Sequence, residues 1–379
     1  MNWEIKRMDE CCSFISDGDH LPPPKAENGI PFITITNIDP INNSIDFSSA
    51  MFVPPSYYDA LGDARKARKN DILYSVVGSF GIPVLLTEDK KFVFQRHIAL
   101  VRPDCKVVLP EFLYYTMKSH AFYSQADSYA IGSAQRTLSL GSLRKMKIKV
   151  PPLKKQESIA SLLRYYDSLI DINNKRIKAL EQMAENLYKE WFVRFRFPGH
   201  ETAEFENGLP KGWEYKKLNA VFEIRYGKEH KDLEEGTIPI FGSGGIMRYG
   251  NRALFTGESV LIPRKGTLNN VLYYNGPFWT VDTMFYTVLS KRNFAKYAFY
   301  TLSSIDMESY NTGAALPSMT TDILYNLKIL IPDERTLTLF DRYISDIYNN
   351  KNVLTKVNEK LIHQRDLLLP RLMSGKLEA

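Results

Sequence analysis

Apolar residues recur at heptad spacing along two long stretches of the chain. Between Ile159 and Trp191 they fall every seven residues, except at Asn173, and again four residues after each of those positions. A 4-3 repeat of this length is typical of a long helix packed along a partner helix. The spacing returns between Phe340 and Leu372. The residues expected to pair the two helices are Ile159, Leu163, Tyr166, Ile170, Ile177, Leu180, Leu187, Phe340, Ile347, Leu354, Leu361 and Leu368.

Either helix alone could be an ordinary core helix of a globular domain. Two of them, each about 35 residues long, exceed the usual globular length and favour an intramolecular coiled coil. The prolines at 151–152 place the start of the first helix near Leu153, and it is expected to run to about Phe195 before Pro198. Pro370 is expected to kink the second helix or to end it early.

Asn173 lies within the first apolar repeat, and Asn350 lies in the corresponding zone of the second. One interpretation is that both side chains face solvent. The other is that they are buried polar positions that fix the register of the helices at some expense of stability.

The region before the first helix mixes short strand-like runs with turns. Residues 30–38 and 71–77 are rich in β-branched and aromatic residues and predict strands, residues 111–124 predict a helix, and residues 146–150 predict a further strand. From Leu209 the same order of segments recurs. The matched segments are 3–8 with 213–218, 30–33 with 238–241, 71–73 with 259–261, 114–116 with 299–301, 128–132 with 309–313, and 147–151 with 328–332.

The repeat predicts two α/β (α+β-type) domains, each followed by a long helix. The expected segments are a first domain at 1–150, a first spacer helix at 151–198, a second domain at 199–331 and a second spacer helix at 332–379. The offset between copies falls from 210 to 181 within the domain, so the copies share a frame but differ in their loops. Antiparallel helices would relate the copies by a pseudo-two-fold axis. A helix of about 38 residues is about 57 Å long.

Composition narrows the function only slightly. A chain of 379 residues with 44% apolar content can form two or three domains, and a net charge of +6 suits nucleic-acid binding as well as ordinary soluble proteins. Three unpatterned cysteines indicate neither a disulfide framework nor a zinc site. The absence of a signal-like or membrane-spanning apolar run predicts a soluble cytoplasmic protein.

Searches for catalytic motifs fail. Residues 241–247 resemble a dinucleotide-binding loop, but Met247 stands where the last glycine is needed. Glu229 after Gly227-Lys228 excludes a phosphate-binding P-loop, and residues 53–57 lack the asparagine of an amino-methyltransferase motif. The six histidines show no metal-ligand spacing, and His97 is interpreted as a structural or contact residue. A binding role therefore gains weight.

Candidate DNA-contacting residues cluster in loops of both copies. In the first copy a cationic run could be a solvated loop or could contact phosphates, and the Gly/Ser-rich loop at 132–137 could be an ordinary turn or could read base edges. In the second copy, cations and amides gather in equivalent turn-rich loops. The candidates are Arg65, Lys66, Arg68, Lys69, Ser79, Arg96, Gln135, Arg136 and Thr137, and then Arg248, Arg252, Arg264, Lys265, Thr267, Asn269 and Asn270.

Several short motifs, in this order and duplicated around two helices, resemble the specificity (S) subunit of type I restriction-modification systems. They are the LPKGWE sequence at 209–214, DIL at 71–73 followed by Gly78 and Gly81, GSAQRTLS at 132–139, PPLKKQ at 151–156 and LMSGKL at 372–377. Lys155 stands where the family has an acidic residue, and the second copy has Pro332-Asp333-Glu334 where PPL is expected.

The resemblance implies a non-catalytic subunit in which two target recognition domains read the halves of a split, asymmetric DNA site. It implies docking of two DNA methyltransferase (M) subunits and of restriction/motor (R) subunits. S-adenosylmethionine, ATP and Mg are then expected on those partners and no cofactor on this chain, nor any membrane association. A helix of about 57 Å limits the half-site centres to about 16 base pairs apart. The alternative is a protein-interaction scaffold built on a coiled coil without a DNA role.

Overall fold

The computed structural model describes residues 3–20, 23–132, 136–313 and 316–377. The chain forms two compact units: unit 1 contains residues 1–173 and 356–379, and unit 2 contains residues 174–355. Each unit holds one α/β domain together with part of both long helices. The boundary between the units falls within both predicted spacer helices, at residues 173–174 and 355–356.

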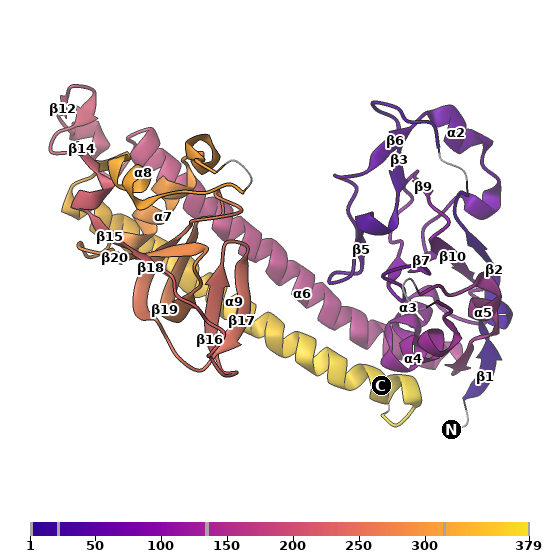
Figure 1. Cartoon of the computed structure of the whole chain (residues 1–379). Helices are drawn as coiled ribbons and strands as arrows, with labels where there is room; N and C mark the ends of the chain where they lie inside the picture. Colours follow the sequence, from indigo (N-terminus) through magenta and orange to yellow (C-terminus); the bar gives the residue numbers. More distant parts are fainter. Residues whose placement is uncertain (1–2, 21–22, 133–135, 314–315, 378–379) are drawn as a thin grey trace. The chain divides into compact units, whose positions relative to one another are not determined.

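The domain of unit 1 is built from short strands and helices (Figure 1). Its strands are β1 (Glu4–Arg7), β2 (Cys12–Asp17), β3 (Ile30–Ile33), β4 (Ile38–Asp39), β5 (Ser44–Ile45), β6 (Met51–Val53), β7 (Ile72–Ser75), β8 (Pro83–Leu85), β9 (Val93–Phe94), β10 (Ile98–Pro103) and β11 (Lys147–Val150). Its helices are α1 (Met8–Cys11), η1 (Ile35–Asn37), α2 (Pro55–Ala60), η2 (Asp63–Arg65), α3 (Pro110–Lys118), α4 (His120–Tyr129) and α5 (Leu140–Lys145).

The domain of unit 2 has longer strands and fewer of them. They are β12 (Phe205–Glu206), β13 (Leu209–Pro210), β14 (Glu214–Lys217), β15 (Phe222–Tyr226), β16 (Ile238–Gly242), β17 (Gly245–Gly250), β18 (Phe255–Pro263), β19 (Leu272–Thr280), β20 (Met284–Leu289) and β21 (Lys328–Ile331). The helices are η3 (Lys189–Val193), η4 (His200–Thr202), η5 (Leu218–Ala220), α7 (Ala295–Ser303), η6 (Met307–Tyr310) and α8 (Thr321–Asn326).

The strand pairings of the two units follow one pattern. In unit 1, β2, β10, β7 and β8 form an antiparallel sheet, β3 pairs in parallel with β9, and β1 pairs with β11. In unit 2, β15, β20, β18 and β19 lie in the same antiparallel order, β16 pairs in parallel with β19, and β14 pairs with β21. The long strand β19 takes the places of both β8 and β9. Unit 2 therefore has one six-stranded sheet where unit 1 has two smaller sheets.

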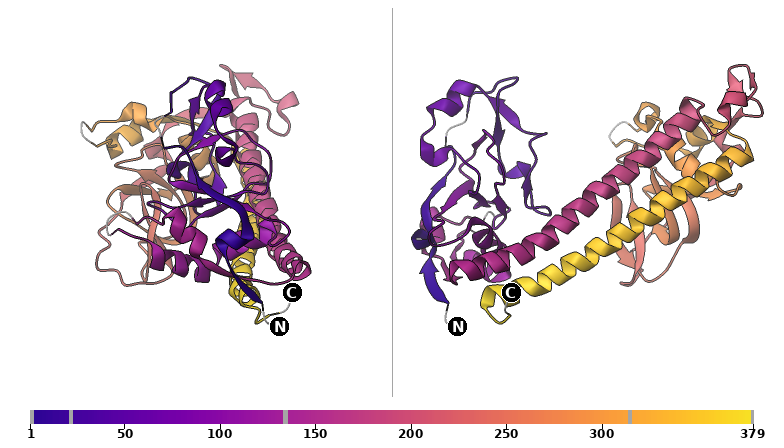
Figure 2. Two further views of the ribbon diagram at one scale, coloured as in Figure 1. Left: turned by 90° about the vertical axis from the view of Figure 1, so that its right-hand side faces the viewer. Right: turned by 180° about the vertical axis from the view of Figure 1, so that it is seen from behind.

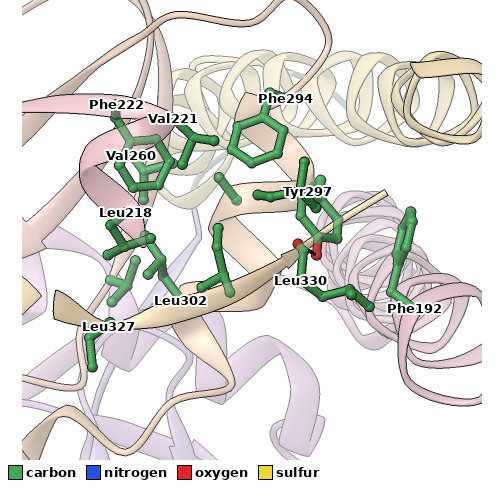
Figure 3. Close-up of a cluster of buried hydrophobic side chains, with 14 of the residues drawn as sticks. Phe192, Leu218, Val221, Phe222, Val260, Phe294, Tyr297, Leu302, Leu327 and Leu330 are labelled. Carbon is green, nitrogen blue, oxygen red and sulfur yellow. Dashed lines mark hydrogen bonds between the residues drawn. The ribbon is translucent and has the colours of Figure 1, made fainter. Parts of the chain in front are cut away.

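The core of unit 2 lies between the sheet, α7 and the two long helices. Tyr297 and Leu302 of α7 face this core, together with Phe294 just before α7, Val260 of β18 and Phe192 of η3 (Figure 3). The rings of Phe192 and Tyr297 meet edge to face at a centroid distance of 4.6 Å. Burying an aromatic side chain of this size contributes about 1.5–3 kcal/mol, so this contact fixes the domain firmly on the end of the first long helix.

Two long helices, α6 (Leu153–Tyr188) and α9 (Glu334–Ser374), continue from one unit into the other. In unit 1 they are joined by a 2.7 Å ion pair between Asp167 and Arg365 and by a 2.8 Å hydrogen bond between Asn173 and Asn358. Between these two contacts the residue number rises from 167 to 173 along α6 and falls from 365 to 358 along α9. The two helices therefore run antiparallel in unit 1 (Figure 2).

The same antiparallel contact continues within unit 2. Glu181 of α6 binds Lys351 of α9 at 2.5 Å, and Trp191, in the π-helical turn η3 after α6, packs its ring 5.8 Å from that of Phe340. The twelve residues expected to pair the helices are all buried or half-buried. Val357 of α9, which is not among these twelve, is 39% exposed.

The first turns of the two helices are fixed by different residues. Gln156 is fully buried; its side chain accepts from the Leu109 amide at 2.8 Å and donates to the carbonyls of Val107 and Pro151. In the second copy Asp333 accepts from the Thr336 amide at 2.9 Å and from the Trp213 indole at 2.8 Å. Aspartate at this position is a favourable helix N-cap. The departure from the PPL pattern at 332–334 therefore provides an alternative way to start the helix.

Several expectations about element limits were wrong. Residues 111–124 form two helices, α3 and α4, because Ser119 ends the first and accepts from the Phe122 amide to cap the second. Residues 30–38 do not form one continuous strand. The first strand ends at Ile33, the Asn37 side chain accepts from the Thr34 amide and closes a helical turn, and Ile38 begins β4. The end of the first long helix agrees with the expected end at about Phe195: helical conformation continues through η3 to Val193, and Phe195 has a left-handed φ of 57°.

Pro370 does not end the second long helix, which runs on to Ser374. Proline removes one main-chain hydrogen bond from a helix interior. Here Leu369 and Leu372, on either side of it, are buried in the core of unit 1. Tertiary packing of an apolar face supplies most of a helix's stability in a folded protein, so this packing outweighs the missing bond.

Candidate nucleic-acid interface

Three loops meet at one end of the central strands in each unit, and together they are called here the three-loop frame. In unit 1 they are residues 76–81, 95–98 and 131–138, of which 133–135 lie outside the described residues. In unit 2 they are residues 264–270, 281–284 and 312–319, of which 314–315 lie outside. Main-chain hydrogen bonds hold the three loops together in each unit.

The first and third loops are joined by matching bonds. In unit 1 the Gly78 amide donates to the Arg136 carbonyl at 3.2 Å, and the Leu138 amide donates to the Val76 carbonyl at 2.8 Å. The corresponding bonds of unit 2 are Gly266 to Pro317 at 2.9 Å and Met319 to Arg264 at 2.8 Å. Gly78 and Gly266 both have left-handed φ values, 73° and 87°, which favour glycine.

The second loop is a tight turn bonded to the first. In unit 1 the Ile98 amide donates to the Gln95 carbonyl at 3.0 Å, and the Val76 amide donates to the His97 carbonyl at 2.9 Å. In unit 2 the equivalent bonds are Met284 to Val281 at 3.0 Å and Arg264 to Thr283 at 2.8 Å. The two turns therefore have the same place and the same backbone.

A glycine in each unit lets an extended segment cross beside this turn. The Gly18 amide donates to the Ile98 carbonyl, and a Cβ on Gly18 would lie 2.1 Å from the Phe94 carbonyl oxygen. The Gly227 amide donates to the Met284 carbonyl, and a Cβ there would lie 2.0 Å from the Val281 carbonyl oxygen. No side chain fits at either position.

The side chains on this common backbone differ at almost every position. The pairs of equivalent positions, with the residue of unit 1 first and that of unit 2 second, are Val76 and Arg264, Val77 and Lys265, Gln95 and Val281, Arg96 and Asp282, His97 and Thr283, and Arg136 and Pro317. In unit 1 the cations of the frame stand on the second and third loops, and in unit 2 they stand on the first. One backbone thus presents two different sets of charges and hydrogen-bonding groups.

The cationic run of unit 1 is partly neutralised by the chain itself. Arg65 lies 3.4 Å from the buried carboxylate of Asp19, and Arg68 lies 3.5 Å from Asp63. Lys66 donates to the Asp59 carbonyl at 3.0 Å. Asp19 also accepts from the Tyr57 hydroxyl, and its carbonyl accepts from the Arg96 amide, so Arg65 is tied to the second loop. Lys69 is exposed.

The other candidates of unit 1 lie on the frame. Arg136 binds Asp127 of α4 by an ion pair of 3.0 Å and a 2.6 Å bond to its carbonyl, so its guanidinium fastens the third loop to that helix. Ser79 lies on the first loop and Thr137 on the third, and Arg96 is exposed on the second. Gln135 lies outside the described residues.

The candidates of unit 2 divide into two groups. Arg248 donates to the carbonyls of His230 and Leu233, Asn269 binds Asp306 and the Met307 amide, and Asn270 donates to the Ser243 carbonyl. These side chains hold loops in place. Arg252, Lys265 and Thr267 keep exposed surface, and Arg264 lies against the ring of Tyr226 while donating to the Asp282 carbonyl at 3.1 Å.

Of the two second loops, only Arg96 was predicted from the sequence to contact DNA. Gln95, Asp282 and Thr283 were not selected, because residues 95–97 and 281–283 have no amino acid in common. Gln95 Nε2 donates to His97 Nδ1 at 2.7 Å. Partial burial, and then the charge of Arg96, lower the pKa of His97. The neutral ring can therefore keep accepting this bond.

Across the described ranges, no three or more His, Cys, Asp or Glu side chains come together as a metal ion would need. None of the helices in the described part of the chain is long and apolar enough to cross a bilayer.

These features define a two-domain α/β protein whose domains carry one loop frame with different side chains. The family model described as type I restriction modification DNA specificity domain matches residues 1–182 and again residues 210–359. The chain therefore belongs to this family and carries two of its domains.

The chain is similar to specificity subunits of known enzymes. It is 26% identical over 305 residues to the type I restriction enzyme MjaIX specificity subunit of Methanocaldococcus jannaschii, covering 71% of this chain and 69% of that protein. It is 23% identical over 405 residues to the putative MjaX specificity subunit of the same organism, covering 99% of this chain and 94% of that protein.

Solved structures share the fold. The crystal structure of the type I restriction-modification S subunit from M. genitalium aligns with a TM-score of 0.62 and 16% identity, covering 98% of this chain and 96% of that one. A chain from a structural study of complex assembly and conformational transition in a type I R-M system aligns with a TM-score of 0.52 and 16% identity, covering 99% and 98%.

Proposed function

We propose that this chain is the non-catalytic DNA-recognition subunit of a type I restriction-modification complex, with two target recognition domains that each read one half of a bipartite, asymmetric site. The observation that carries the proposal is the three-loop frame. The same main-chain bonds recur in both units, while the side chains on them differ. Two domains with the same loop backbone but different side chains suit a DNA site whose two halves differ in sequence.

The surface chemistry agrees with this role. Lys69 is exposed in unit 1, and Arg252 and Lys265 keep accessible surface in unit 2. Cations of this kind contact phosphates and set the position of a protein on a duplex without reading sequence. The hydrogen-bonding groups of the frame would then reach the base edges in the major groove.

The long helices would set the distance between the two half-sites. At 1.5 Å per residue, the 36 residues of α6 span about 54 Å. With about 3.4 Å per base pair, the half-site centres would lie at most about 16 base pairs apart. The antiparallel contacts in each unit support a paired, rigid element rather than a flexible linker.

Catalysis would belong to the partners. We propose that two DNA methyltransferase subunits dock on this chain and supply adenine methylation with S-adenosylmethionine. Restriction/motor subunits would supply ATP- and Mg-dependent cleavage.

The test is the methylation pattern of the reconstituted complex. The wild-type chain with its methyltransferase subunits should methylate one bipartite sequence with a fixed spacer, read by methylation-sensitive sequencing. Binding of the same complex to duplex DNA should weaken steeply as salt rises, because phosphate contacts release counterions. A complex without sequence preference and with salt-independent binding would instead favour the protein-interaction scaffold.

A further inference from the structure

One position of the three-loop frame carries opposite charges in the two units. Arg96 is the second residue of the turn 95–98, and Asp282 is the second residue of the turn 281–284. Both turns are closed by a bond of 3.0 Å between their first carbonyl and fourth amide. Their third residues, His97 and Thr283, accept the equivalent bonds from the first loop. The two charged residues therefore have the same place on one backbone.

Both side chains are free to meet a ligand. Arg96 and Asp282 are exposed, and within the described part of the chain neither the guanidinium nor the carboxylate has a hydrogen-bond or ion-pair partner. Arg65, Arg68 and Arg136 are by contrast paired with Asp19, Asp63 and Asp127. A role in stabilising the fold accounts for those three arginines but not for Arg96 or Asp282.

If this surface contacts DNA, the charge of Asp282 limits which DNA groups it can bind. A carboxylate is repelled by phosphates, so it cannot serve as a backbone contact. It accepts hydrogen bonds only, and the amino group of cytosine is a donor that a carboxylate reads in the major groove. Lys265 and Arg264 on the adjacent loop supply the positive charge that brings a phosphate backbone close to it.

Arg96, at the equivalent position of unit 1, can bind hydrogen-bond acceptors instead of donors. The guanidinium donates from a planar fork and pairs bidentately with the N7 and O6 acceptors of guanine. The turn that presents it is well fixed. Its main chain is tied to the first loop through His97 and to Asp19 through the Arg96 amide, and the Gln95 and His97 side chains are bonded to each other.

Building on the proposed function, we infer that Arg96 and Asp282 are the equivalent base-reading residues of the two domains. Arg96 reads a guanine in one half-site, and Asp282 reads a cytosine through its amino group in the other. The identity of one base pair in each half-site is thereby set at the same point of the frame.

The experiment uses the complete complex with its methyltransferase subunits and compares methylation patterns. Arg96→Lys keeps the positive charge but loses the planar fork, and Asp282→Asn keeps the shape but loses the charge. Each variant should relax or change one base pair in its own half-site, by about ten- to a hundred-fold in discrimination, and leave the other half unchanged. Lys106→Ala and Arg292→Ala are matched controls, because these exposed residues follow the opposite ends of β10 and β20. They should leave the pattern unchanged.

The results separate this inference from the proposed function. If both variants keep the wild-type sequence while Arg96→Ala only weakens binding equally at all sequences, Arg96 contacts phosphate and the inference is overturned. If Asp282→Asn strengthens binding to every sequence without changing preference, the aspartate merely repels DNA and the inference is again overturned. A wild-type complex without sequence preference would overturn the proposed function itself.

Discussion

Asn173 donates its side-chain amide to the Oδ1 atom of Asn358 at 2.8 Å, and both side chains are buried between α6 and α9 in unit 1. Asparagine in an apolar helix seam favours the one register that lets its amide find a partner. Asn350, which the sequence offered as the seam residue of the second helix, is exposed and donates to the Asp346 carbonyl of its own helix.

Replacing Asn173 with leucine should lower the free energy of unfolding by about 1–3 kcal/mol, because Asn358 then loses this bond in an apolar seam. The double variant Asn173→Leu, Asn358→Leu should recover that stability but lose uniqueness of register. Denaturant unfolding measures the first effect, and a mixture of spacers in the methylation pattern would reveal the second. Asn350→Leu is the matched control and should change neither. An unaltered stability of the single variant would contradict the role given to this bond.

Shortening both helices together should shorten the recognised spacer. Removing residues 174–180 and 351–357 takes one heptad from each antiparallel helix and keeps the Asn173–Asn358 pair. The helices lose about 10 Å, so the spacer should shrink by about three base pairs. Removing the heptad from α6 alone should abolish or shorten the recognised spacing. Methylation-sensitive sequencing gives the spacer directly, and an unchanged spacer in the doubly shortened chain would refute the helical ruler.

The glycines beside the second loop should tolerate no side chain. Gly227→Ala would place a Cβ 2.0 Å from the Val281 carbonyl oxygen, so the turn that carries Asp282 must move. Overpacking of this kind costs about 1–3 kcal/mol, and here it should also impair recognition of one half-site. Gly244→Ala is the control, because a Cβ there meets no atom within 4 Å. Thermal unfolding and the methylation pattern together test this, and equal behaviour of the two variants would count against the frame as described.

A buried lysine should make unit 2 sensitive to substitution. Lys296 of α7 lies 2.8 Å from both Glu258 of β18 and Asp341 of α9, and its side chain is 7% exposed. Lys296→Ala leaves two carboxylates facing each other, so unit 2 should lose about 3–5 kcal/mol of stability. Lys291→Ala, at an exposed site, should have almost no effect. Calorimetric unfolding of the two variants is the measurement.

The same network predicts how stability depends on pH. Burial opposes the charge of Glu258, but hydrogen bonds from Lys296 and Tyr273 outweigh it and lower the pKa of Glu258 below its ordinary 4.5. A lowered carboxylate pKa stabilises the fold above pH 4.5, and this contribution is lost as the pH falls through the folded value. Glu258→Gln should therefore show a weaker loss of stability on acidification below pH 4.5 than the wild type. An identical acid dependence of both proteins would contradict the assignment.

Much of the fold follows from periodicity, and the exceptions have physical causes. The heptads located both long helices, and they placed Asn173 within the apolar repeat without deciding between burial and exposure; the structure buries it. The break at Ser119 and the continuation through Pro370 depend on tertiary packing, which no local pattern encodes. The partner Asn358 was missed because its position depends on the antiparallel register.

The candidate site was harder to predict than the fold. The turns 95–98 and 281–284 have the same main-chain hydrogen bonds but no identical residue at any equivalent position. Comparing the two copies by amino-acid identity therefore could not align these turns. Arg136, Arg248 and Asn270 were selected for chemistry suited to DNA, yet their side chains bind the chain itself. Side-chain type indicates what a residue can bind, and only the folded chain shows whether its bonds are already used.

Unit 1 needs residues 356–379 to complete its core, whereas unit 2 is one unbroken run of chain. On the ribosome, the first 173 residues therefore emerge well before Leu369 and Leu372, which cover their apolar surface. Unit 2 can therefore complete its fold before unit 1 does, although most of unit 1 is synthesised first. Until residues 356–379 are made, the apolar surface that Leu369 and Leu372 cover in unit 1 is exposed to solvent. We therefore expect chaperones to bind the nascent first domain, and loss of the C-terminal residues to destabilise it.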